Sequence, residues 1–184
     1  ADIPTKIAFG LAQVYLVQWF AGEDMLNNAT INFQRVIQEY GNGDNPRVRE
    51  FAAEATARLG IVERQQGMTK ASIESFEEAI SLSSIPSRKA LYWSTLADLY
   101  LQGEALEQAT VANKNAIDEY KLAITLADNP QIQASYWAAI SDIYVKLEDI
   151  HNARGSIQVA LDLLPTDSPD YDLFVKKRES LSQK

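Results

Sequence analysis

Two nine-residue stretches of this chain are nearly the same. YWSTLADLY runs from Tyr92 to Tyr100, and YWAAISDIY runs from Tyr136 to Tyr144, 44 residues further on. Both copies have Tyr, Trp, Asp and Tyr at matching places, and the residues between them stay apolar or small. Repetition at a period of tens of residues is typical of stacked supersecondary units that bury the same face against their neighbours. This feature limits the possible folds more than any other.

The rest of the chain has the periodicity of α-helices. Apolar residues recur at spacings of three and four, and prolines stand where helices would begin, as in Asn45-Pro46, Asn129-Pro130 and Ser168-Pro169. Short connections between helices favour antiparallel neighbours. The pattern predicts nine helices, at about 5–20, 26–40, 46–66, 69–83, 87–102, 105–127, 131–147, 149–163 and 169–182.

The copy at residues 136–144 belongs to a longer motif. One helix face carries a large aromatic, an apolar, a small and a second aromatic residue: Trp137, Ile140, Ser141 and Tyr144. After a turn, the next helix continues with Ala153, Ile157 and Ala160, and then Pro165. This set resembles the tetratricopeptide repeat, with Ile157 in place of the usual Phe and Ser141 in place of Gly. Small residues at these places let two helices approach closely.

Earlier parts of the chain fit the same motif less fully. The third unit reads Trp93, Leu96, Ala97 and Tyr100, then Ala116, Tyr120 and Ala123, so we expect its second helix to arrive seven residues late. Seven residues are nearly two turns, so the helix would be longer without rotation of its buried face. The second unit has Leu59, Gly60, Ser72, Phe76 and Ala79 in place, and the first is degenerate. We expect Tyr92 and Tyr136 to pack between hairpins.

The resemblance implies an all-α, right-handed α-solenoid of antiparallel helix pairs, a TPR-like superhelix, with a C-terminal capping helix. We expect residues 1–184 to form a single domain of this kind. Its units would span about 5–41 (degenerate), 46–85, 87–129 and 131–165, and the capping helix would span about 168–182.

In tetratricopeptide-repeat proteins, the first helices of the units line a concave groove that usually binds a peptide. Carried over by position, the resemblance predicts groove residues Glu54, Arg58, Ile61, Arg64, Ser94, Thr95, Asp98, Gln102, Ala138, Asp142 and Lys146. Members that bind chaperone tails clamp a terminal carboxylate with Lys, Arg and Asn. The corresponding places here hold Leu91, Thr95, Ser135 and Ala139, so we expect no chaperone-tail binding.

The predicted groove has charges at repeated places. Asp98 and Asp142 occupy the same place in the third and fourth units, and Arg58 and Arg64 lie one unit earlier. Such a groove would be positive at one end and negative at the other, and would suit a peptide with a Lys or Arg toward the fourth unit. The alternative is that both aspartates are solvated or pair with a neighbouring helix, where exposed ion pairs contribute little.

Composition excludes several kinds of function. The formal charge is −8, and an acidic surface repels phosphate backbones, so we expect no nucleic-acid partner. There is no cysteine, and the one histidine, His151, stands on a turn beside acidic residues. We therefore expect no enzyme activity, no metal site and no cofactor. The most apolar stretch is interrupted by Gln13 and Gln18 and is too short to cross a membrane.

The predicted function is a non-catalytic scaffold that binds a protein or peptide in the groove. The alternative is a structural spacer or self-association domain of a larger bacterial protein, which could be membrane-attached. Phe9, Trp19 and Phe20 crowd the first predicted helix, where they would form a homo-oligomer interface if exposed. Normal burial of that helix is the other possibility. Both a cytoplasmic and an extracytoplasmic location stay open.

Overall fold

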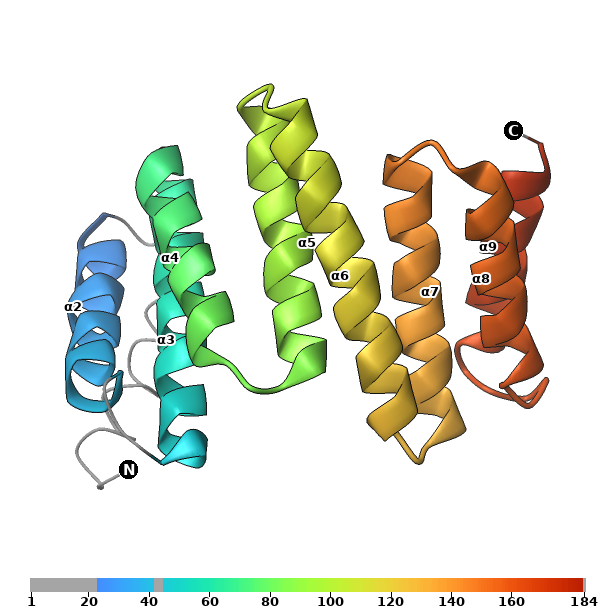
Figure 1. Ribbon diagram of the computed structural model, residues 1–184, viewed down its shortest axis with the longest axis horizontal. Coiled ribbons are helices and arrows are strands. Elements are labelled where there is room, and N and C mark those ends of the chain that lie inside the picture. The colour runs from blue at the N-terminus through green and yellow to red at the C-terminus, as the bar shows by residue number, and fades with distance from the viewer. Residues whose placement is uncertain (1–22, 42–44, 184) are drawn as a thin grey trace.

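The structure, a computed structural model, describes residues 23–41 and 45–183. Regular structure in these ranges is entirely α-helical, which confirms the all-α class (Figure 1). The helices are α2 (Glu23–Tyr40), α3 (Pro46–Gln65), α4 (Thr69–Leu82), α5 (Pro86–Gln102), α6 (Leu106–Leu126), α7 (Pro130–Lys146), α8 (Ile150–Asp162) and α9 (Tyr171–Ser182). The helix predicted at 5–20, with Phe9, Trp19 and Phe20, lies outside the described residues.

Two of the three predicted Asn/Ser-Pro helix starts are present. The side-chain oxygen of Asn45 accepts the backbone N–H of Arg47 at 3.0 Å, and Asn129 does the same for Gln131 at 2.8 Å. A proline follows each cap at the first helical position, where its missing N–H costs nothing. The prediction at Ser168-Pro169 is wrong, because those residues form a turn and α9 begins only at Tyr171.

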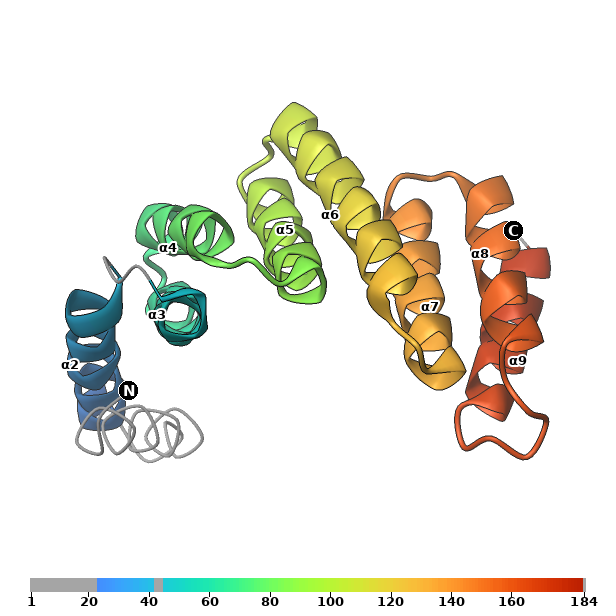
Figure 2. The ribbon, with the colours of Figure 1, turned by 60° about the horizontal axis from the view of Figure 1, so that its bottom comes forward.

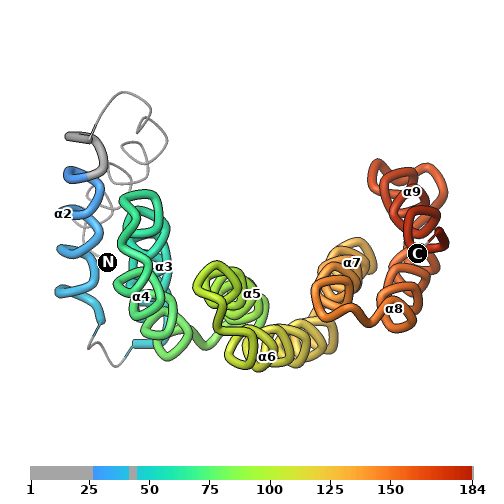
Figure 3. Tube along the Cα trace, turned by 90° about the horizontal axis from the view of Figure 1, so that it is seen from above, coloured from blue at the N-terminus to red at the C-terminus, as the bar shows by residue number. Residues whose placement is uncertain are grey.

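The helices form a solenoid in which each one packs mainly against its neighbours in the chain. Figures 2 and 3 show the hairpins following one another along an arc, with α5 and α7 on its inner side and α6 on its outer side. The buried residues fall into successive clusters, each shared by two or three consecutive helices. This chain of small cores is how a repeat array buries its apolar surface, and it confirms the predicted solenoid.

Small residues allow the helices of one hairpin to approach closely. A Cβ atom at Gly60 would lie 3.0 Å from the ring of Phe76, closer than an ordinary van der Waals contact, so glycine favours the close approach of α3 and α4. The hydroxyl of Ser72 donates to the carbonyl of Gly60 at 2.7 Å. In the α7–α8 hairpin, the hydroxyl of Ser141 donates to the carbonyl of Ala153 at 2.8 Å. These contacts occur at the places that the motif reserves for small residues.

Aromatic pairs join one hairpin to the next. The ring of Tyr92 on α5 is 6.3 Å from that of Phe76 on α4, and Tyr136 on α7 is 5.7 Å from Tyr120 on α6. Both tyrosines therefore pack between hairpins, as predicted from their place before each tryptophan. At these distances the ring pairs add to the stabilisation from burial.

The capping helix α9 covers the end of the last hairpin. Its Phe174 and Leu181 are buried in the cluster formed with α7 and α8. The guanidinium of Arg154 on α8 donates from Nε to the carbonyl of Leu181 at 2.8 Å. The predicted closing helix is thus present, and it ends the stack with an exposed outer face.

The helix α6 is longer than its counterparts, with 21 residues against 14 in α4 and 13 in α8. It begins directly after a short turn in which Glu104 has a positive φ of 58°, matching Glu148 at 59° before α8. The helix predicted at 105–127 is therefore confirmed, and the additional residues extend its C-terminal end, so that Ala116, Tyr120 and Ala123 lie one heptad beyond the place directly after the turn. Its buried face continues without rotation through Ala109, Ala112, Asn113, Ala116, Ile117, Tyr120 and Ala123.

The extra length of α6 displaces the fourth hairpin. Seven residues of helix correspond to about 10 Å along the axis. Since α7 starts where α6 ends, the α5–α6 turn extends beyond the α7–α8 turn at the other end (Figure 1). The displacement also changes which residues face each other, because Asp98 meets Lys146, one helical turn beyond its own counterpart Asp142. We call this displacement the step.

Asn113 occupies the place of the motif that Phe76 and Ile157 fill in the other hairpins. It is 2% exposed, and its side-chain oxygen has no hydrogen-bond partner among the described residues. An unpaired buried amide oxygen is costly, so Asn113→Leu should raise the free energy of unfolding by about 1 kcal/mol in urea denaturation. Asn115→Leu, on the same helix but half-buried, is the control and should change it little. A loss of stability in Asn113→Leu would show that the buried amide is not a cost to the fold.

Candidate functional site

A pocket of about 280 Å³ opens between the first helices of two consecutive hairpins, α3 and α5. Its walls are apolar: Ala57, Ile61, Phe76, Leu91 and Tyr92. Its remaining lining residues are polar: Glu54, Arg58, Arg88 and Thr95. Leu91 is 56% exposed, although most leucines of the described part are buried or half-buried. The pocket therefore combines an apolar interior with charged groups around it, which is how ligand sites are commonly built.

The wall residue Tyr92 stays neutral over the physiological pH range. Burial raises the pKa of Tyr92 to about 12, and the carboxylates of Glu54 and Glu50 add to the increase while Arg88 opposes it. Tyr92 is thus an uncharged residue of the pocket wall rather than a phenolate.

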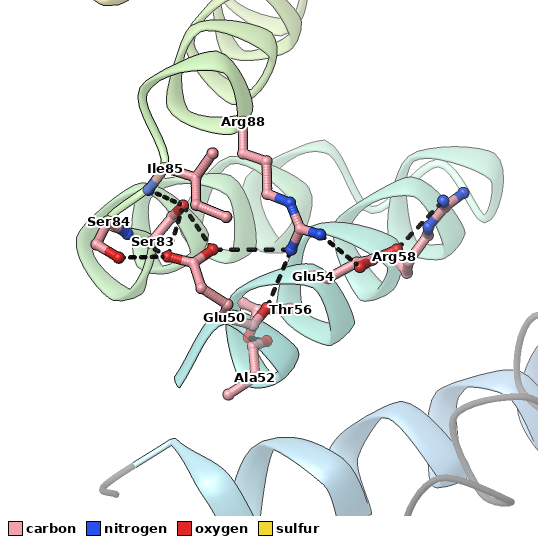
Figure 4. Close-up of polar contacts among 9 residues, drawn as sticks. All are labelled: Glu50, Ala52, Glu54, Thr56, Arg58, Ser83, Ser84, Ile85 and Arg88. Atoms are coloured by element: carbon pink, nitrogen blue, oxygen red, sulfur yellow. Dashed lines mark hydrogen bonds and ion pairs between the residues drawn. The ribbon is translucent and has the colours of Figure 1, made fainter. Parts of the chain in front are cut away.

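A polar network fixes the junction beside the pocket (Figure 4). Glu50, in the first turns of α3, is 9% exposed and accepts hydrogen bonds from the linker between α4 and α5. Its carboxylate accepts the hydroxyl of Ser83 at 3.0 Å, the hydroxyl of Ser84 at 2.9 Å and the backbone N–H of Ser84. Arg88 lies 3.7 Å from the same carboxylate. The network ties the second hairpin to the start of the third.

Ion pairs connect α3 to α5, α5 to α7, and α7 to the capping helix α9. Arg88 on α5 is 3.4 Å from Glu54 on α3, Lys146 on α7 is 2.5 Å from Asp98 on α5, and Lys177 on α9 is 2.7 Å from Asp142 on α7. In each pair the acid precedes the base in the chain. Both aspartates of the predicted groove therefore pair with a neighbouring helix, which is the alternative that the sequence left open. These partly exposed pairs contribute little stability.

The structure brings some of the predicted groove residues together and separates others. Glu54, Arg58, Ile61 and Thr95 line the α3–α5 pocket. Arg64 and Gln102 are exposed near the C-terminal ends of α3 and α5. Ser94 is half-buried, Asp98, Asp142 and Lys146 are held in ion pairs, and Ala138 is 7% exposed with its carbonyl accepting Lys177.

Phe76, Arg88 and Tyr92 contribute to the site, although none of them stands at a groove place predicted from the resemblance. Phe76 comes from α4, a second helix, which the groove rule does not consider. Arg88 and Tyr92 lie on the same face of α5 as Leu91 and Thr95. In chain order, Arg88, Leu91, Tyr92 and Thr95 occupy positions i, i+3, i+4 and i+7. That helical spacing was visible in the sequence and could have identified Arg88 and Tyr92 as pocket residues.

Other chemistry is not evident in the described part of the chain. Among residues 23–41 and 45–183 there is no group of three or more side chains placed to hold a metal ion. The described helices include none with the length and apolar character needed to span a membrane.

Comparisons with known proteins agree with the fold. A family model described as a tetratricopeptide repeat matches residues 53–85. The crystal structure of BtubC (BKLC) from P. vanneervenii is similar with a TM-score of 0.60 and 13% identity, covering 97% of this chain and 82% of that one. The N-terminal domain of stress-induced protein-1 (STI-1) from C. elegans has a TM-score of 0.48 and 20% identity, covering 73% of this chain and 97% of that one. Curated protein sequences include no match to the chain.

The matched segment coincides with the hairpin of α3 and α4, which carries Gly60, Ser72 and Phe76 at the motif positions. The match confirms the resemblance predicted from the sequence. Residues 53–85 thus match the tetratricopeptide repeat, and they lie within an all-α solenoid of helical hairpins.

Proposed function

We propose that this chain is a binding module that holds an extended segment of a partner protein in the groove along α3, α5 and α7. The α3–α5 pocket would take one aliphatic side chain of that segment. The observation that supports this most directly is the pocket itself, an apolar space of about 280 Å³ with the exposed Leu91 at its edge. Apolar anchors in such pockets supply most of the energy of many protein interfaces.

The test uses a displayed library of random peptides selected on the wild-type chain, followed by fluorescence anisotropy with the selected peptides. Leu91→Asp should weaken their binding by about tenfold, because a carboxylate would face the apolar anchor. Leu91 is 56% exposed, so the fold should tolerate the change. Leu122→Asp on α6, at a residue 49% exposed and absent from the pocket lining, is the matched control. Equal affinity of wild type and Leu91→Asp would rule out the pocket as the anchor site.

The same peptides test whether the groove prefers basic residues toward the fourth hairpin. A Lys or Arg of the partner would have to displace Lys146 from Asp98 or Lys177 from Asp142. We therefore expect the double change Asp98→Ala with Asp142→Ala to alter affinity by less than about threefold. A larger loss would instead support a groove with a negative end.

A further inference from the structure

A second pocket lies at one end of the fourth hairpin, between the start of α7 and the linker from α8 to α9. Both segments appear at the lower end of that hairpin in Figure 1. The pocket has a volume of about 410 Å³, and its walls are largely apolar, with Leu163 and the exposed Pro130, Pro165 and Pro169. None of its lining residues belongs to the α3–α5 pocket. We call it the end pocket.

Hydrogen bonds hold the walls of the end pocket in place. The side-chain amide of Gln131 on α7 donates to the hydroxyl of Ser168 in the linker at 3.3 Å. Within the linker, the backbone N–H of Ser168 donates to the carbonyl of Pro165 at 3.0 Å, and that of Tyr171 donates to the carbonyl of Ser168 at 3.0 Å. The prolines fix their own φ angles. An occupant would therefore lose little affinity to ordering of the linker.

The surroundings of the end pocket are acidic. The segments that form this end of the hairpin, residues 122–136 and 158–175, contain five aspartates and no Lys or Arg. Asp167 lines the pocket, and the others are Asp128, Asp162, Asp170 and Asp172. All five are exposed, and none of them forms an ion pair with another described residue.

Nearby basic residues and helix ends do not balance these aspartates. Lys121 and Lys176 border the two segments in the chain but do not line the end pocket, and counting both would still leave the aspartates in excess. Lys177 is already paired with Asp142 at 2.7 Å. The C-terminal ends of α6 and α8 and the N-terminal ends of α7 and α9 meet here, so the helix dipoles largely cancel. The side chains therefore give this end of the hairpin a negative potential.

We propose that the end pocket binds a basic segment of a partner protein. The stem of one Lys or Arg would lie on Leu163 and the prolines, with its charged group at Asp167. Long basic side chains bury their methylene groups on apolar surface while the charge stays in water. The apolar walls favour such a side chain over a hydrated metal ion, and the surrounding aspartates would attract the neighbouring basic residues of the same segment.

The experiment is an NMR titration of the ¹⁵N-labelled chain with the capped peptide Lys-Ala-Lys-Ala-Lys. Saturable shifts should appear at residues 129–131 and 163–169. Asp167→Asn should raise the Kd by about fivefold, as the loss of one exposed ion pair does. Asp167 is exposed, so the fold should tolerate the change. Glu107→Gln, which removes an exposed carboxylate at the other end of α6, is the matched control and should bind as the wild type does.

Two modified peptides separate the contributions of charge and apolar contact. The acetyl-lysine version keeps the stem without the charge and should give no saturable shifts. The version with 2,4-diaminobutyric acid keeps the charge on a shorter stem and should bind more weakly than the lysine peptide. The proposal is overturned if the pocket residues do not shift, if Asp167→Asn binds normally, or if either modified peptide binds as well as the lysine peptide. Leu91→Asp should leave this titration unchanged, so a failed groove and a failed end pocket give different results.

Discussion

Replacing Phe76 with alanine is expected to lower the free energy of unfolding by about 3–4 kcal/mol, more than any other substitution at the α3–α5 junction. Phe76 is 2% exposed and makes contacts in three directions. Its ring covers Gly60 within the hairpin, faces Tyr92 across the junction to the next hairpin, and forms part of the α3–α5 pocket. No other described side chain joins all three of these features.

Urea denaturation followed by circular dichroism measures this effect. Phe76→Leu, which retains most of the apolar volume, is the graded control and should lose about 1 kcal/mol. Tyr92→Phe removes only a hydroxyl and should change stability little. If Phe76→Ala lost less than about 1 kcal/mol, the hairpin contacts at Gly60 could not be the basis of the α3–α4 pairing.

Replacing Glu50 with alanine is expected to cost about 2 kcal/mol and to loosen the connection between the second and third hairpins. The buried hydroxyl of Ser83 and the backbone N–H of Ser84 would lose their acceptor. Arg88 is 37% exposed and would regain water, which limits the loss. The linker between α4 and α5 should therefore open more often, and limited proteolysis should cut it faster than in the wild type.

Glu50→Gln is the informative second variant, because it keeps the shape and one acceptor oxygen and should show an intermediate loss. Glu78→Ala, an exposed glutamate on α4, is the matched control and should behave as the wild type. Wild-type stability and wild-type cleavage of the linker in Glu50→Ala would show that the aromatic contact between Phe76 and Tyr92 holds the junction without the network.

The fold could be predicted from the sequence because its evidence is local and repeated. The tryptophan, the small residue and the tyrosine of α5 recur in α7 at the same helical spacing, and Asn45 and Asn129 stand before prolines where helices begin. Ser168-Pro169 has the same local pattern, but α9 begins only at Tyr171, and its Phe174 is buried in the core of the last hairpin.

The alignment of α6 with the repeat motif was harder to predict than its length, because two overlapping patterns fit the helix. Ala116, Tyr120 and Ala123 resemble the motif, but so does the set one heptad earlier, in which Asn113 replaces the expected large apolar residue. Because Asn113 is polar, the earlier set did not match the motif, and the later set was aligned with it instead. The equivalent turns at Glu104 and Glu148 show that the earlier set is the one that directly follows the turn. Residue spacing alone does not reveal this turn geometry.

The candidate site depends on contacts between residues far apart in the chain. Glu50 meets Ser83 and Ser84 more than thirty residues later, and Asp98 meets Lys146 at a separation of 48. Repeat spacing predicts which face of a helix looks into the groove, but not which charges will already be paired there. The aspartates were therefore placed on the right helices while their partners were not predicted.

The long α6 has a consequence for any partner that follows the inner wall. The third and fourth hairpins are offset by about 10 Å along their helix axes, so they present two contact surfaces at different heights. A stiff rod could make full contact with only one of them. An extended partner segment that contacts both hairpins must cross this offset near α6. Spanning about 10 Å takes about three additional residues in extended conformation. The protein would thus select ligands by the length of the linker between their two contact motifs as well as by the motifs themselves.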